Sequence, residues 1–107
     1  MIAVIFEVHP KSERKQEYLD IAAILKEELV KVEGFISVER FQSLTNPDKI
    51  LSLSFFENET AVKKWRELKS HRAAQQSGRN GIFEDYRLRV ASVIRDYGME
   101  DRDEVPK

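Results

Sequence analysis

The fold is decided by the stretch FISVERFQSLTNPDKILSLSFF, residues 35–56. Its two ends, residues 35–43 and 50–56, are rich in the β-branched and aromatic side chains that favour strands. Between them lies a turn cluster of Asn46, Pro47 and Asp48, residue types that fix or tolerate turn backbone conformations. The stretch therefore predicts two consecutive strands joined by a loop.

Amphipathic helices are predicted on both sides of this strand pair. The first begins near Ser12, a candidate N-cap, and ends at Gly34, where a left-handed residue would terminate it. The second begins after the N-cap candidate Asn58, and a short helical piece follows at residues 70–76. Apolar side chains recur at spacings of three and four along both helices: Tyr18, Ile21, Leu25, Leu29 and Val32 in the first, Ala61, Val62, Trp65 and Leu68 in the second.

Two more strands enclose this arrangement. Residues 2–8 form an apolar strand that stops before His9 and Pro10, since proline disfavours further pairing. Residues 86–97 form the last strand, and the charged residues 98–107 follow as a tail outside the domain of residues 1–97. The order βαββαβ predicts an α+β, ferredoxin-like fold, in which two helices cover one face of a four-stranded antiparallel sheet.

Length and composition set the limits of the functional interpretation. A chain of 107 residues with 41% hydrophobic and 35% charged residues is one globular domain. A net charge of −1 gives nucleic acid or an anionic membrane no electrostatic attraction. The absence of cysteine excludes thiolate chemistry and fits a cytoplasmic protein, and no apolar run reaches membrane-spanning length.

Alternation along the strands separates the two faces of the sheet. The row Ile2, Val4, Phe6 and Val8 is wholly apolar, so we expect it to meet the helices. In the third strand we assign Leu51, Leu53 and Phe55 to that same face. The other face would then mix serines and acids with large apolar groups, which predicts a partly polar cavity and a homodimer whose sheets pack face to face; these apolar groups are Ile5, Phe41, Ile50 and Phe56.

The stretch AVKKWRELKSHRAAQ, residues 61–75, resembles the second-helix signature of the antibiotic biosynthesis monooxygenase family. That signature is a helical tryptophan, here Trp65, followed by a histidine, here His71, before the last strand. The element order and the chain length add to the resemblance, which spans about residues 1–97. It implies a dimeric α/β barrel and a monooxygenase, an oxidoreductase that uses O2.

Two branches of the family imply different cofactors. The haem-degrading branch carries an asparagine in strand one, a tryptophan in helix two and an iron-ligating histidine ten residues later. The corresponding residues here are Glu7, Trp65 and Gln75, so only the tryptophan matches. His71 instead matches branches that oxidise aromatic or quinol-like molecules without metal or flavin. Haem binding stays an alternative, as does a non-catalytic dimer that binds a small ligand.

A cofactor-free oxygenase needs a base that converts a phenol-like substrate into an electron-rich anion inside a dry pocket. We expect His71 or Glu7 to be this base. Trp65 and Tyr86 would stack on the substrate ring. For Trp65 the ordinary explanation is that the amphipathic helix needs a large core anchor.

Basic residues of the last strand would complete the site. Arg87 or Arg89 would stabilise the phenolate, because guanidinium stays charged at any relevant pH. The ordinary explanation is an ion pair between one of them and Glu7. His9 and His71 are the only histidines and have no carboxylates at ligand spacing, so no metal site is predicted.

Overall fold

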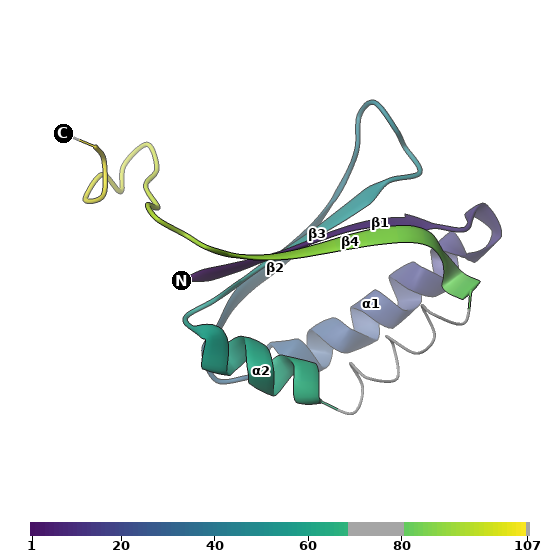
Figure 1. The fold of residues 1–107 in the computed structure, drawn as a ribbon, viewed down its shortest axis with the longest axis horizontal. Helices are drawn as coiled ribbons and strands as arrows, with labels where there is room; N and C mark the ends of the chain where they lie inside the picture. Colours follow the sequence, from purple (N-terminus) through teal and green to yellow (C-terminus); the bar gives the residue numbers. More distant parts are fainter. Residues whose placement is uncertain (69–80, 107) are drawn as a thin grey trace.

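The computed structural model describes residues 1–68 and 81–106 and contains the predicted order of elements (Figure 1). The antiparallel sheet has the strand order β2-β3-β1-β4, and both helices lie on one of its faces. The α+β, ferredoxin-like fold is therefore confirmed. The strands are β1 (Ile2–Pro10), β2 (Phe35–Gln42), β3 (Ile50–Phe56) and β4 (Phe83–Ser92); the helical elements are the 3-10 turn η1 (Ser12–Arg14), α1 (Lys15–Leu29) and α2 (Glu59–Glu67).

The pairing register shows which side chains share a face. Val4 of β1 is opposite Ser54 of β3 on one side and Val90 of β4 on the other. Because directly opposed residues point to the same face of a sheet, Ser54 lies on the helix-covered face with Val4. Phe6 and Ser52 form the next such pair on this face.

The expected face assignment is correct for β1 and wrong for β3. Ile50 and Phe56 lie under the helices, where they are 5% and 0% exposed, whereas Leu51 and Leu53 lie on the open face. Both alternating rows of β3 contain apolar residues, so hydrophobicity alone could not tell them apart; the pairing with β1 does.

Several element ends differ from expectation, among them the end of α1 at Leu29, the end of β2 at Gln42 and the start of β4 at Phe83. β1 continues through His9 to Pro10, because the sheet tolerates proline at the register shift between those two residues. β4 ends at Ser92, the residue opposite Ile2 where β1 begins, and beyond it Val93 N donates a 3.0 Å hydrogen bond to the carbonyl of Met1. Ser12 makes no capping hydrogen bond, and α1 begins only at Lys15, after η1.

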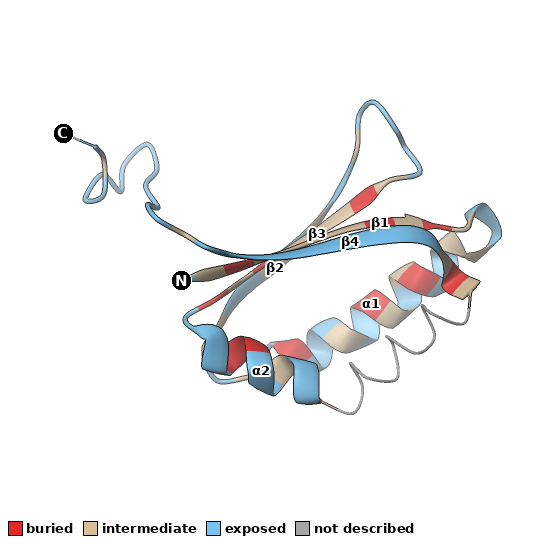
Figure 2. Ribbon diagram, in the orientation of Figure 1, coloured by how far each residue is buried: buried red, intermediate tan, exposed pale blue. Residues whose placement is uncertain are grey.

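The core consists of two apolar clusters between the helices and the sheet (Figure 2). One cluster joins Val8 of β1 to Tyr18 of α1 and Ile50 of β3. The other joins Leu29 at the end of α1 to Phe56 and Val62. None of the described helices is long and apolar enough to cross a membrane.

Beyond β4 the chain leaves the sheet and projects away from it (Figure 1). Gly98 N donates a 2.7 Å hydrogen bond to the carbonyl of Asp101, and the Arg102 guanidinium lies 5.6 Å from the centre of the Tyr97 ring. These contacts are all local to the tail. The boundary between domain and tail at residue 97 stays a prediction.

Asn58 has the predicted role, whereas Gly34 does not end α1, because the helix ends at Leu29 with its C-cap at Val30, four residues before Gly34. The Asn58 side chain accepts a 2.9 Å hydrogen bond from Ala61 N and so caps α2. Gly34 has a φ of +89°, and its carbonyl accepts a 2.7 Å hydrogen bond from Glu57 N. A Cβ atom at Gly34 would lie 2.8 Å from the Cβ of Ala61, so this joint between α1, β2 and α2 requires glycine.

We predict that Gly34→Ala lowers the free energy of unfolding by about 1–3 kcal/mol, because it adds a left-handed non-glycine residue and a steric clash. Urea unfolding followed by circular dichroism measures the loss. Gly98→Ala is the control, since a Cβ there meets no atom within 4 Å. Equal stability of the two variants would contradict the structural role of Gly34.

Candidate functional site

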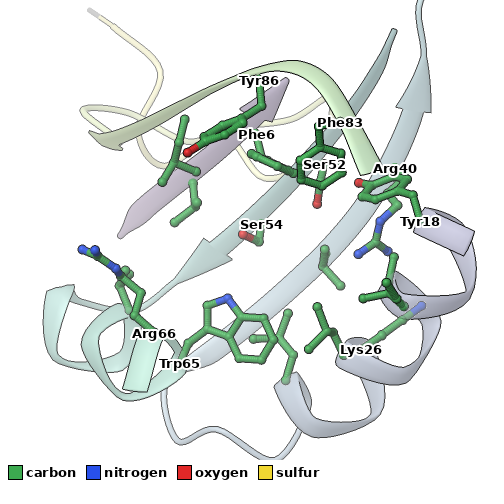
Figure 3. Close-up of a pocket in the computed structure, with 18 of the residues that line it drawn as sticks. Phe6, Tyr18, Lys26, Arg40, Ser52, Ser54, Trp65, Arg66, Phe83 and Tyr86 are labelled. Carbon is green, nitrogen blue, oxygen red and sulfur yellow. The ribbon is translucent and has the colours of Figure 1, made fainter. Parts of the chain in front are cut away.

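A cavity of about 380 Å³ lies between the helix-covered face of the sheet and helices α1 and α2 (Figure 3). This volume is within the range of small-molecule sites. Its floor is formed by alternate residues of all four strands, and its roof by the apolar faces of the two helices. Most of the lining is apolar, and the serine hydroxyls of Ser52 and Ser54 interrupt it on β3.

Aromatic rings line one region of the cavity. The Phe6 ring lies 5.7 Å from the Tyr86 ring and 5.9 Å from the Phe83 ring, measured between centroids. The Tyr18 ring of α1 contacts Phe83 at 5.5 Å. Edge-to-face and tilted contacts between aromatic rings at these distances are favourable, and they hold the rings in fixed orientations. The rings therefore form a rigid aromatic wall.

Trp65 projects from α2 into the same cavity (Figure 3). It also packs against the core cluster of Leu29, Phe56 and Val62. The functional and the ordinary interpretations of Trp65 are therefore compatible, because one side of a large ring can anchor a helix while another side contacts a ligand.

Among the described residues, all the charged side chains that line the cavity are cationic: Lys26, Arg40 and Arg66. Within the described residues none of the three forms an ion pair with a carboxylate. The Arg40 Nε atom is buried and has no hydrogen-bond partner there. Burial raises the pKa of Tyr18, and the nearby charge of Arg40 offsets part of that rise. Tyr18 is therefore a neutral phenol near neutral pH.

The structure separates the six residues that the sequence suggested for the site. Trp65 and Tyr86 line the cavity. Glu7, its cross-strand partner Arg87, and Arg89, which is opposite Ile5, lie on the other, open face of the sheet, because Glu7 alternates with the cavity-lining Phe6. The remaining candidate, His71, lies outside the described residues, as does Gln75.

Glu7 takes part in a small network of ion pairs on the open face. Its Oε2 atom lies 3.4 Å from Lys49 Nζ and 3.5 Å from Arg89 Nη1. The hydrogen bond from Lys49 is the main reason why the pKa of Glu7 lies below its usual 4.5. A carboxylate held in its charged form is a poor proton acceptor near neutral pH. The ordinary interpretation, pairing with a β4 arginine, thus fits the geometry.

Sequence reasoning missed Arg40 and Tyr18 and assigned no role to Ser52 and Ser54. The alternation in β2 contained a usable signal, because Val38 and Arg40 share a face and an arginine beside an apolar residue on a covered face is unusual. Tyr18 was recognised only as a core position of α1. Its contact with Arg40 joins residues far apart in the sequence, and no local pattern reports it.

The fit of metal and haem ligands depends on the residue types in this lining. In the described part of the chain no three His, Asp or Glu side chains form a group able to hold a metal ion. The described lining residues include no histidine, cysteine or methionine, the common axial ligands of haem apart from tyrosine. Of the haem-ligand residue types, the described lining therefore contains only tyrosine, at Tyr18 and Tyr86.

Comparison with known proteins agrees with this architecture. The family model described as antibiotic biosynthesis monooxygenase matches residues 1–77. This chain belongs to that family. Its family membership agrees with the resemblance seen around Trp65.

Two known proteins are similar in sequence to this chain over 93 residues, which is 87% of the chain. The jasmonate monooxygenase ABM of Pyricularia oryzae is 46% identical, and the match spans 43% of that longer protein. The uncharacterised protein YqjZ of Bacillus subtilis is 31% identical, with 79% of its length matched. The chain therefore spans less than half of the Pyricularia protein.

Solved structures share the fold of this antibiotic biosynthesis monooxygenase family member. A Deinococcus radiodurans protein superposes with a TM-score of 0.83 at 11% identity, covering 92% of this chain and 98% of that one. A conserved Methanosarcina mazei protein gives a TM-score of 0.77 at 21% identity, covering 84% and 89%. At such identities the likeness concerns the fold alone.

We predict that the Glu7 carboxyl titrates below pH 4.5 in the folded protein, measured by carbon NMR of the side chain. Because its folded-state pKa is lowered, charged Glu7 stabilises the fold above its ordinary pKa, and this contribution disappears as the pH falls through the lowered value. Lys49→Met should raise the midpoint more than Arg89→Met does. A midpoint unchanged by Lys49→Met would contradict the network.

Proposed function

We propose that this chain is a monooxygenase that oxidises a small aromatic or quinol-like substrate with O2 and needs neither metal nor flavin. The observation that carries the proposal is the mostly apolar cavity between the sheet and the helices, lined by Trp65 and Tyr86, in a member of this family. A dry, aromatic-lined site favours substrates that are flat and readily give up electrons.

The proposed reaction balances without an external reductant. An activated methylene next to an aromatic ring becomes a carbonyl, which takes four electrons and two hydrogen atoms from the substrate. One oxygen atom of O2 enters the product, and the other leaves as water. Hydroxylation of an ordinary C–H bond takes only two electrons from the substrate and would require a reductant for the other two. The proposal therefore specifies substrates with an activated methylene or a quinol ring.

The residues have distinct roles in this proposal. Trp65 and Tyr86 stack on the substrate ring, and His71, which the family resemblance assigns as a base, removes a proton. Arg66 follows Trp65 in α2 and lines the cavity beside it (Figure 3). It takes the part first expected of Arg87 or Arg89, because a guanidinium stays charged and stabilises an oxyanion. Glu7 has no role in this site, since it is ion-paired on the open face.

We predict O2 consumption by the purified protein, in the presence of EDTA, with anthrones, dihydroxynaphthalenes or catechols, measured with an oxygen electrode. His71→Ala should lower kcat by roughly 10²–10⁴-fold, the usual effect of a general base. Trp65→Phe and Tyr86→Leu should lower kcat/KM by about 2- to 10-fold each through weaker stacking. Tyr97→Phe is the matched control outside the cavity and should keep the wild-type rate.

The other outcomes separate the rival functions. Binding of a panel member without O2 consumption would replace the oxygenase with a ligand-binding domain. A Soret band on haem addition that disappears in His71→Ala would favour the haem branch. Jasmonic acid is one arm of the panel because the Pyricularia relative is named a jasmonate monooxygenase. Jasmonic acid is tested with and without a reductant, because hydroxylation of an ordinary C–H bond would require two electrons from a reductant.

We also propose that the open face of the sheet pairs with the same face of a second copy. This face carries the apolar side chains Ile5, Phe41, Leu51, Leu53 and Phe55, and neither helix covers it (Figure 1). The Phe41 side chain on this face is 43% exposed to solvent. Contiguous apolar surface of this kind marks an association site in a monomer. A two-fold symmetric contact would cover both faces at once.

We predict a dimer mass in multi-angle light scattering. Leu53→Glu should shift the mass to that of a monomer, because a charge in a face-to-face sheet contact would be buried without a partner. Leu44→Glu, at a fully exposed loop position, is the matched control and should stay dimeric. A wild-type monomer would refute the proposed pairing.

A further inference from the structure

The charges of the cavity are distributed unevenly along its length. Figure 3 shows Arg40 beside Tyr18 in one part of the cavity, apart from Arg66 and Trp65 in another. The described lining residues include no carboxylate that could neutralise these cations. A cavity lined this way attracts anions, since the low dielectric of an enclosed site strengthens an unscreened charge.

Arg40 is the cation most restricted by its surroundings. Its buried Nε has no hydrogen-bond partner among the described residues, whereas Lys26 and Arg66 are exposed at the edges of the cavity. A buried donor without a partner is destabilising, and an acceptor supplied by a ligand would remove that cost. Tyr18, the polar group near Arg40, is a neutral phenol and cannot balance the charge.

The sheet register places a second donor beside Arg40. Arg40 of β2 is directly opposite Ser52 of β3, and Ser52 is directly opposite Phe6 of β1. Leu88 of β4 completes this row across the cavity floor. Neighbouring positions on one face lie about 4.5–5.5 Å apart. The floor therefore changes from a guanidinium and a hydroxyl at one end to apolar side chains at the other.

We propose that the cavity binds substrates that carry a carboxylate, with this group on Arg40 and Ser52 and the apolar body over Phe6 and Leu88. A guanidinium presents parallel N–H groups that match the two oxygens of a carboxylate, which favours this group over a single phenolate oxygen. The inference rests on the proposed function for its site. It makes Arg40 the residue that anchors the substrate, while Trp65 and Arg66 contact the part that reacts.

The size of the cavity limits the acid. At about 30 Å³ for each water-sized group, a volume of about 380 Å³ holds roughly a dozen non-hydrogen atoms. This corresponds to one or two rings with a short acidic side chain. A long-chain fatty acid would not fit, and a bare inorganic anion would leave the apolar end empty.

The experiment is a calorimetric titration that requires no turnover. The probes are 4-cyclohexylbutanoic acid and its uncharged isostere, 4-cyclohexylbutanamide. The wild type should bind the acid at least tenfold more tightly than the amide at neutral pH, because a charge-assisted hydrogen bond contributes about 1.5–3 kcal/mol. This preference should persist in 0.5 M NaCl, since salt screens a buried pair weakly.

Substitutions assign the preference to Arg40. Arg40→Met should weaken acid binding about tenfold or more and leave amide binding within about twofold, and retained amide binding shows that the variant is folded. Arg40→Lys should restore part of the preference for the acid over the amide, because the lysine ammonium keeps the positive charge but lacks the parallel N–H groups of the guanidinium. Arg95→Met removes an exposed arginine outside the cavity and should change neither affinity.

Three outcomes would overturn the inference. Equal affinity of the wild type for acid and amide would remove the carboxylate anchor and leave the proposed oxygenase intact. Sulfate that displaces the acid at similar concentrations would show a site for small inorganic anions. Failure of both probes to bind would reject the cavity as a site for such ligands. Oxygen uptake by neutral quinols would still support the oxygenase in any of these cases.

Discussion

The antiparallel register of β1 between β3 and β4 is the constraint on which the rest of the structure depends. It places Val4 opposite both Ser54 and Val90 and thereby gives every strand residue one of two faces. A shift of one residue would exchange the cavity floor with the open face. Packing reinforces the observed register, because it buries Ile50 and Phe56 under the helices and keeps the Glu7 ion pairs in contact with water.

The same register places the charged side chains on two faces of the sheet with different surroundings. On the open face Glu7 meets Lys49 and Arg89, so cations and anions neutralise each other at the surface. On the covered face Arg40 stands opposite Ser52, with no carboxylate among the described lining residues. A surface pair of this kind contributes little to stability, whereas a charge inside a cavity affects which ligands enter it. The cavity is therefore the electrostatically distinctive part of the sheet.

The position of Trp65 links stability to the candidate site. It contacts the core cluster at the end of α1 and also lines the cavity, so the helix that it anchors is the helix that positions Arg66. In the aromatic wall, Tyr18 belongs to the first core cluster, and Phe6 and Phe83 pack against that cluster. A rigid core that doubles as a ligand wall needs little rearrangement to bind, which lowers the entropic cost of association.

The sequence by itself determined the order of elements, the ferredoxin-like fold, the cap at Asn58 and the left-handed backbone at Gly34, because periodicity, turn chemistry and left-handed backbone requirements are local properties. It also identified the family through the residues around Trp65 and placed Tyr86 among the candidates. Only the tertiary structure decided that Glu7, Arg87 and Arg89 lie away from the cavity and that Arg40 lies in it. Both rows of β3 contain apolar residues, so the face of each residue depended on cross-strand pairing, which joins residues distant in the chain and leaves no local signal.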